Sequence, residues 1–138
     1  MAEIVDVVNQ EDEVIRQAAR ERCHNEKLIH RGVAVMVFRS DDMRELLLQR
    51  RTSKVAIKPD YVGLTGGHVL AGESYTEAAE REYNEELHHE SGKEVELEEL
   101  FKVKKSTDGD HEFVKVFRAV DSGLFDLNDL EVGGSVLP

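Results

Sequence analysis

Three glutamates, Glu82, Glu85 and Glu86, lie close together in a stretch that is expected to be helical. At about 100° per residue they fall within an arc of roughly 100° of the helix surface, so their carboxylates repel one another. A run of like charges is usually a solvated face. The alternative is a site for a hard divalent cation, because Mg²⁺ and Mn²⁺ prefer carboxylate oxygens and keep positions open for water or phosphate.

The residues that precede these glutamates favour the cation site. Five residues separate Gly67 from Glu73, seven separate Glu73 from Arg81 and Glu82, and the pair Glu85–Glu86 follows. This pattern resembles the Nudix box, in which these residue types occur at these spacings. The sequence departs from the box at positions 88 and 89, where histidines replace a glycine and an apolar residue. The resemblance therefore predicts a helix that runs further than the helix of the family.

The resemblance to Nudix hydrolases implies a fold, an activity and a metal site. The family folds as an α/β/α sandwich with a mixed central sheet and cleaves a nucleoside diphosphate linked to another group. Carried over, Glu82, Glu85 and Glu86 would bind Mg²⁺ or Mn²⁺, with help from a backbone carbonyl of Gly66 or Gly67. The cation would orient a water and lower its pKa. Either Glu85 or Glu86 would lie nearest that water.

Two further roles follow from the same resemblance. Arg81 and Glu73 would pair with each other and shape the loop and helix of the box. Glu112 would add a ligand from a later strand, as an additional glutamate does in many Nudix sites. These roles are expectations for the structure to test.

The order of the segments "LIHRGVAVMVF", "LLLQRR" and "GGHVLAGES" resembles the Nudix branch that contains isopentenyl-diphosphate isomerase. In that isomerase, histidines and two late acidic residues bind a metal, and a cysteine transfers a proton. The residues that match or lie near those metal ligands are His24, His30, His68, Asp110 and Glu112. Gly66 stands at the position of the cysteine, and Cys23 lies in another segment. The isomerase interpretation therefore lacks its proton-transfer group.

Other polar and aromatic residues have a structural interpretation beside the functional one. His30 at the start of a strand needs only a hydrogen bond, and His68 needs no metal to lie beside a glycine-rich loop. The basic residues Arg50, Arg51, Lys54 and Lys58 either contact substrate phosphates or form a solvated loop. Tyr61 and Phe113 either stack on a planar group or pack in the core.

Three functions compete at this point. They are a metal-dependent diphosphate hydrolase, an isomerase acting on a prenyl diphosphate, and a non-catalytic binding module of the Nudix fold. A binding module usually loses its Arg-Glu and Glu-Glu pairs, and both pairs are present here. We expect the hydrolase, with a small phosphorylated substrate.

The composition bounds the partners and the compartment. The chain has 138 residues, which predicts a single domain over residues 1–138. Its formal net charge of −11 disfavours nucleic acid polymers and anionic membranes as partners. Cys23 is the one cysteine, so no internal disulfide is possible, which fits the cytoplasm. Neither a signal peptide nor an apolar run of about 20 residues is evident.

The first half of the chain predicts two strands around a turn at Asn9 to Asp12, then a polar loop, "ERCHNEKLIHR". The continuous apolar run "GVAVMVF" is typical of a strand buried on both faces. Another strand, "ELLLQRR", is followed by a long loop over "TSKVAIKPDYVG".

A capping box of Ser74 and Glu77 predicts a helix that runs to about His89 and ends at Ser91–Gly92. Two more strands follow, "VELEELFKVKK" and "HEFVKVFRAV". The class is therefore α/β or α+β with a mixed sheet. The C-terminal stretch predicts no closing helix, so either that helix is truncated or a partner chain covers the sheet, as in a homodimer.

Overall fold

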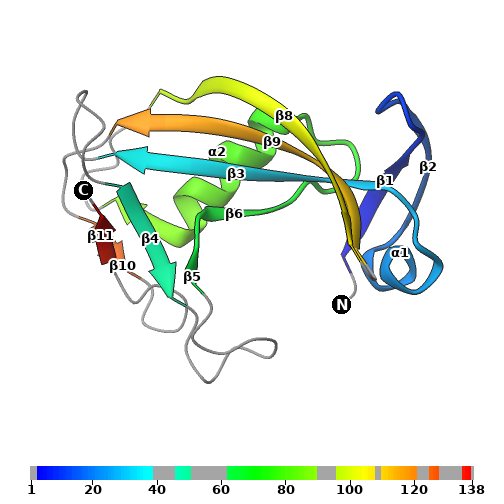
Figure 1. Cartoon of the computed structure of the whole chain (residues 1–138), viewed down its shortest axis with the longest axis horizontal. Helices are drawn as coiled ribbons and strands as arrows, with labels where there is room; N and C mark the ends of the chain where they lie inside the picture. The colour runs from blue at the N-terminus through cyan, green and yellow to red at the C-terminus, as the bar shows by residue number, and fades with distance from the viewer. Residues whose placement is uncertain are drawn as a thin grey trace.

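The computed structural model describes residues 3–38, 46–50, 62–89, 96–107, 110–120, 125–127 and 135–137. It contains a mixed sheet with a helix packed on one face, which confirms the predicted α/β class (Figure 1). The elements within these ranges are β1 (Ile4–Val8), β2 (Val14–Ala19), α1 (Arg20–Glu26), β3 (His30–Phe38), β4 (Leu46–Arg50), β5 (Val62–Gly63), β6 (Thr65–His68), α2 (Tyr75–Glu86), β7 (Leu87–His89), β8 (Glu98–Thr107), β9 (Asp110–Val120), β10 (Phe125–Leu127) and β11 (Ser135–Leu137).

The central sheet has the strand order β11-β4-β3-β9-β8, with β5 beside β4 and β6 beside β3. Strands β3 and β9 run parallel, and the other pairs are antiparallel. The parallel register sets His30 opposite Glu112, and the antiparallel register of β6 sets His68 opposite Gly32. Two of the predicted histidines and the late glutamate thus start from neighbouring positions of the sheet.

Strand β3 has no exposed residue on either face. Val33, Val35 and Val37 are buried and belong to the main core, and on the other face Gly32 and Phe38 are buried while Ala34 and Met36 are partly buried. The expectation of a strand buried on both faces is therefore met fully on the first face and in part on the second. The three valines point to the same face, because successive side chains of a strand point to opposite faces, and this is the face that α2 covers.

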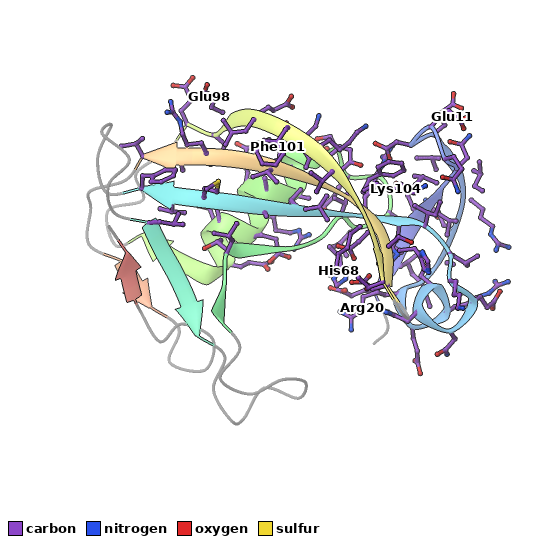
Figure 2. All side chains as sticks on the ribbon, in the orientation of Figure 1. Glu11, Arg20, His68, Glu98, Phe101 and Lys104 are labelled. Atoms are coloured by element: carbon purple, nitrogen blue, oxygen red, sulfur yellow. The ribbon has the colours of Figure 1, made fainter. Side chains whose placement is uncertain are left out.

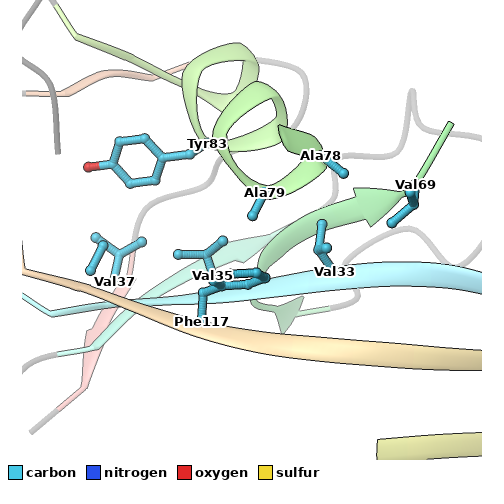
Figure 3. Packing of buried hydrophobic residues seen from close by; sticks show 9 residues of the cluster. Val33, Val35, Val37, Val69, Ala78, Ala79, Tyr83 and Phe117 are labelled. Carbon is cyan, nitrogen blue, oxygen red and sulfur yellow. The ribbon is translucent and has the colours of Figure 1, made fainter. Parts of the chain in front are cut away.

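Helix α2 begins with the capping box that the sequence predicts. The Glu77 amide donates to Ser74 Oγ at 3.1 Å, and the Ser74 amide donates to Glu77 Oε1 at 2.9 Å. Ala78, Ala79 and Tyr83 form its buried stripe and pack on the valines of β3 (Figure 3). The small alanines let the helix axis lie close to the sheet.

The helix ends earlier than predicted. It stops at Glu86, and Leu87–His89 form β7, which pairs with β10. The prediction of a helix to His89 is wrong because the backbone of Leu87–His89 finds partners in another strand, which no helical periodicity reveals. Its predicted end at Ser91–Gly92 lies outside the described residues.

The segment predicted as a polar loop is instead the helix α1. Its Cys23 is buried with Val5, Val7 and Ala18 in a second, smaller core cluster. The helix ends at Lys27 in the left-handed conformation, with the amide of Leu28 bonded to the Cys23 carbonyl. A helix with one buried side chain shows no hydrophobic periodicity in the sequence. The contact of Cys23 with the β1–β2 hairpin therefore stabilises a helix that the sequence pattern does not predict.

The hairpin of β1 and β2 confirms the predicted strand–turn–strand. Its turn is held by Asn9, whose Oδ1 accepts hydrogen bonds from the amides of Glu11 and Glu13. The carboxylate of Asp12, at the end of this turn, joins the hairpin to the rest of the protein.

Asp12 accepts from three side chains on three other elements. Its donors are Arg31 Nε at 2.8 Å, Tyr75 Oη at 2.7 Å and Lys102 Nζ at 2.8 Å. Burial opposes the charge of Asp12, but these hydrogen bonds outweigh burial and hold its pKa below the usual range. The hairpin is therefore fixed to β3, α2 and β8 by one ionised carboxylate.

Several predicted residues fall outside this description. Arg51, Lys54, Lys58 and Tyr61 lie outside the described residues, as does most of the predicted loop at residues 52–63, whose last two residues, Val62–Gly63, instead form β5. Over the part of the chain that the structure covers, no helix has the length and apolar character needed to span a bilayer.

Candidate functional site

Arg81 on α2 connects the loop before the helix to the helix itself. Arg81 donates to both oxygens of Glu73, from Nε at 2.8 Å and from the terminal nitrogen at 3.0 Å. The same nitrogen also donates to the His68 carbonyl at 2.9 Å. The Arg81 guanidinium lowers the pKa of Glu73, and Glu73 in turn raises the pKa of Arg81. This bidentate pair fixes β6, the loop and α2 relative to one another.

Glu82 lies against the backbone of β6. Arg81 donates to its Oε1 at 2.8 Å, and the Glu82 side chain is only 13% exposed. A Cβ added at Gly67 would come within 2.5 Å of the Glu82 carboxyl carbon. Any other residue at position 67 would displace this carboxylate, so the glycine permits the Glu82 carboxylate and the β6 backbone to share one site.

Of the other two predicted ligands, the structure describes the side chain of Glu85 but not that of Glu86. Glu85 is 60% exposed and lies 3.4 Å from a terminal nitrogen of Arg81, one turn along α2 from that arginine. Glu86 is the last residue of α2, and its side chain is outside the described part. The described residues therefore bring Glu82, Glu85 and Arg81 together on one face of the helix beside Gly67.

A second group of possible ligands lies across the sheet, where β3 and β9 begin. The potential ligand atoms of His24, His30 and His68 lie within 4.8 Å of one another, and so do those of His30, Asp110 and Glu112. Rings of neighbouring histidines are 5.6 Å apart in both His24–His30 and His30–His68. His30 is shared by both sets, so it stands at the centre of the group.

The orientation of His30 suits a ligand. Its Nδ1 lies 3.2 Å from the Leu28 carbonyl, which must accept a hydrogen bond, so Nδ1 carries the proton. Its Nε2 faces the carboxylates, 3.2 Å from Glu112 Oε2 and 3.8 Å from Asp110 Oδ1. Within the described residues, this Nε2 and Asp110 Oδ1 are buried without a well-directed hydrogen bond. Two buried polar atoms that face each other without a hydrogen bond fit a pair of ligands for a cation.

Protonation differs between the two central histidines. Burial lowers the pKa of His68 to about 4, with Arg20 and His30 adding to the decrease, so its imidazole is neutral at pH 7. Burial also opposes the charge of His30, but Glu112, the Leu28 carbonyl and Asp110 outweigh it and raise the pKa of His30. The same carboxylates that favour a proton on His30 would also attract a cation, so a metal and that proton would compete.

Gly32 connects this histidine group to the site on α2. A Cβ at Gly32 would lie 2.8 Å from Glu112 Oε1 and 3.3 Å from the Gly67 carbonyl oxygen. Both oxygens therefore lie over the same glycine, with Glu112 from the histidine group and Gly67 from the box. The histidine group therefore adjoins the backbone of Gly67, against which Glu82 lies from the side of α2.

The donor types of the two sets favour different cations. The carboxylates of Glu82 and Glu85 with the Gly67 carbonyl are hard oxygen donors that fit Mg²⁺ or Mn²⁺. Three imidazoles with two carboxylates also fit Mn²⁺ and further accept borderline metals such as Zn²⁺ and Fe²⁺.

One functional candidate, Arg20, was missed from the sequence. Arg20 begins α1, and its side-chain nitrogen lies 3.4 Å from His68 Nδ1. Figure 2 labels both side chains, which lie near each other. It is about half exposed and also approaches Glu3 at 3.9 Å. Its four-residue spacing from His24 would have indicated a shared helix face, had the segment been predicted as a helix.

The position that a cysteine occupies in the isomerase has no room for a side chain. A Cβ at Gly66 would lie 2.2 Å from the Val33 carbonyl oxygen, so β3 and β6 pack too closely for any residue but glycine. The region thus keeps the acidic and histidine ligands and excludes a thiol at this point.

Known proteins carry related sequences and folds. The chain is 44% identical over 86 residues to YfcD of Escherichia coli strain K12, named an uncharacterized Nudix hydrolase. That match covers 62% of this chain and 47% of the relative, so the match spans about half the length of the curated protein.

Two solved structures show the same architecture. The crystal structure of DR0079 from Deinococcus radiodurans has a TM-score of 0.76 at 26% identity, covering 98% of this chain and 83% of that one. The crystal structure of the MutT NUDIX hydrolase from Burkholderia pseudomallei has a TM-score of 0.63 at 26% identity. That match covers 79% of this chain and 82% of the other. The profile of the NUDIX domain matches residues 29–134, which is most of the sequence. With the box residues assembled on α2, the chain belongs to the Nudix family.

Proposed function

We propose that the protein is a metal-dependent hydrolase of a small metabolite that contains a diphosphate, with Mg²⁺ or Mn²⁺ as its cation. The observation that carries this proposal is the Glu82 carboxylate held against Gly67 by Arg81, with Glu112 beside Gly32 and near the Gly67 carbonyl. A bound divalent cation would neutralise the diphosphate and lower the pKa of an attacking water.

The residues of the chain have separate tasks in this proposal. Glu82, Glu85 and Glu86 bind the cation, and Glu85 or Glu86 accepts the proton of the water. Arg81 and Glu73 position the helix and are not in contact with substrate. Glu112 and His30 extend the metal region, and Arg20 contacts a substrate phosphate because it is exposed beside His68.

The setting of the enzyme also belongs to this proposal. We assign it to the cytoplasm, since the described Cys23 is a free, buried thiol, and we treat residues 1–138 as one Nudix domain. Small metabolites suit the net charge of −11 better than nucleic acid polymers or membranes do. The proposal includes a homodimer.

One observation favours a second candidate, an isomerase of prenyl diphosphates. The group of His24, His30, His68, Asp110 and Glu112 matches the ligand set expected from that branch. The close packing at Gly66 weighs against it, because no proton-transferring side chain fits there. A third candidate, a binding module without catalysis, has no observation in its favour here.

A substrate panel separates these candidates. The purified protein is incubated with nucleoside diphosphates linked to sugars or nucleosides, and with prenyl diphosphates, in the presence of Mg²⁺ or Mn²⁺. We expect release of phosphate or of a nucleoside monophosphate from at least one compound. Conversion of one prenyl diphosphate into its double-bond isomer would establish the isomerase instead, and tight binding without turnover would establish the binding module.

The variant Glu85→Gln tests the assignment of the site. We expect turnover to fall more than about 100-fold, since loss of even an outer partner of a metal site costs about 10–100-fold. Glu80→Gln is the matched control, because Glu80 is exposed on another face of the same helix. A Glu85→Gln protein that turns over substrate at the parent rate would place the chemistry elsewhere.

A further inference from the structure

Strand β8 is a long and accessible edge of the central sheet. It ends the strand order, and within the described residues no strand pairs with its outer side. All ten of its residues are exposed, including Leu100, Phe101 and Val103 at 40%, 52% and 45%. An exposed edge with apolar side chains is a template for pairing with another strand.

The charges of β8 are divided between its two halves. The first half contains Glu98 and Glu99, and the second contains Lys104 and Lys105. Figure 2 shows Glu98 and Lys104 far apart along the strand, with Phe101 between them. A strand that is acidic at one end and basic at the other is complementary to itself when a second copy runs antiparallel to it.

The register with β9 determines which of these side chains share a face. Glu99 and Lys104 stand opposite Phe117 and Phe113, on the face that α2 covers. Glu98, Phe101, Val103 and Lys105 lie on the other face, opposite β9 residues of that face. Leu100 is the extra residue of a bulge and takes no partner on β9.

We propose that two copies of this chain pair through β8, antiparallel about a two-fold axis at Lys102, and join their sheets into one. With the bulge residue left out of the count, Glu99 stands opposite Lys104 of the second copy, and Glu98 stands opposite Lys105. Phe101 then stands opposite Val103. Each pair occurs twice by symmetry and keeps both members on the same face.

The like charges at the axis are already compensated. Lys102 donates to Asp12 at 2.8 Å within its own chain, so its ammonium does not face its copy unpaired. Within one chain, Glu98 contacts Arg118 at 2.6 Å and Lys105 contacts Asp110 at 2.8 Å. Pairing of the two copies would join these contacts into a network. A second copy is therefore a better partner than a uniformly acidic or basic strand, since either would meet like charges along half of β8.

Charge reversal at one complementary pair tests the interface by sedimentation equilibrium. The parent protein should show a mass that rises with concentration to twice that of the monomer. Glu99→Lys and Lys104→Glu should each weaken association about 10-fold, because attraction turns into repulsion at two symmetric positions. An equimolar mixture of the two variants should associate again, since each supplies the charge that the other needs. Glu80→Lys controls for the change in net charge and should associate like the parent.

The interface also depends on apolar contact, which Phe101→Ser removes. This variant should be monomeric across the same concentrations, while circular dichroism confirms that it is folded. A parent protein that is monomeric throughout overturns the proposal. A dimer that is indifferent to Glu99→Lys, Lys104→Glu and Phe101→Ser overturns it equally, because its contact would then lie elsewhere. None of these outcomes depends on the hydrolase activity.

Discussion

At the scale of single residues, the acidic site depends on glycines as much as on glutamates. Gly67 leaves the space into which the Glu82 carboxylate packs, and Gly32 leaves the space shared by Glu112 and the Gly67 carbonyl. A carboxylate against bare backbone is pre-organised, because it needs no rearrangement to bind a cation. The glycines therefore decide where the negative charge is concentrated.

The substitution Gly67→Ala tests this dependence. We expect turnover to fall about 10–100-fold, because the new methyl group would displace the Glu82 carboxylate from the proposed cation site. The free energy of unfolding should fall by only about 1–3 kcal/mol, the usual cost of one overpacked side chain. Steady-state kinetics and urea denaturation measure the two effects. Unchanged kinetics with a destabilised protein would show that Gly67 serves packing alone.

Much of this residue pattern was predictable from the sequence, and some was not. The spacing of Gly67, Glu73, Arg81 and Glu82 indicated a shared site, and the structure brings these residues into contact. Arg20 was not predicted, because its role requires helix α1 to lie beside β6. Long-range contacts of this kind leave no local signal in a single sequence.

At the scale of elements, the N-terminal hairpin and α1 form a unit with its own small core, fixed to the larger core by Asp12. The family profile begins at residue 29, so this unit precedes the matched region. It nevertheless supplies His24 and Arg20 to the histidine group. A change in how the hairpin is attached to the sheet would therefore affect the position of His24 and Arg20 in the histidine group as well as the stability of the protein.

Six of the strands and the start of α2 followed from periodicity and capping, whereas the short strands β5, β6, β7, β10 and β11, the end of α2 and the helix α1 did not. The helix ends at Glu86 because the next three residues pair with β10, and α1 forms because Cys23 packs against the hairpin. Both outcomes are tertiary contacts that override local preference. Local patterns predict an element most reliably where its own buried stripe is continuous, as in β3 and α2.

The substitution Asp12→Asn should destabilise the protein by about 1–3 kcal/mol at pH 7, since it removes the charge from three hydrogen bonds. Because the pKa of Asp12 is lowered in the folded state, its stabilisation is fully present above the unfolded pKa of about 4. It is lost as the pH falls through the lower folded value.

The difference between parent and Asp12→Asn should therefore shrink in acid, as urea denaturation at pH 7 and pH 3 would measure. Glu11→Gln, a neighbouring exposed residue of the same turn, is the matched control and should change stability little at either pH. An Asp12→Asn protein as stable as the parent at pH 7 would show that the hairpin is held by its apolar core alone.

At the scale of the whole molecule, the charge of −11 is unevenly distributed. Three cations, Lys102, Lys104 and Lys115, approach the rings of Tyr75 and Phe113. Carboxylates gather on α2 and where β9 begins. An acidic protein can bind an anionic diphosphate only if cations intervene, so the distribution agrees with a metal-dependent reaction.

The central claim is that the glutamates of α2 bind a divalent cation together with a diphosphate. Electron paramagnetic resonance of Mn²⁺, titrated with a non-hydrolysable nucleoside diphosphate analogue present, tests it most directly. We predict that the parent protein and Glu80→Gln bind Mn²⁺ and that Glu85→Gln binds it at least about 10-fold more weakly. Free Mn²⁺ throughout the titration of the parent, or equal binding by Glu85→Gln, would contradict the claim.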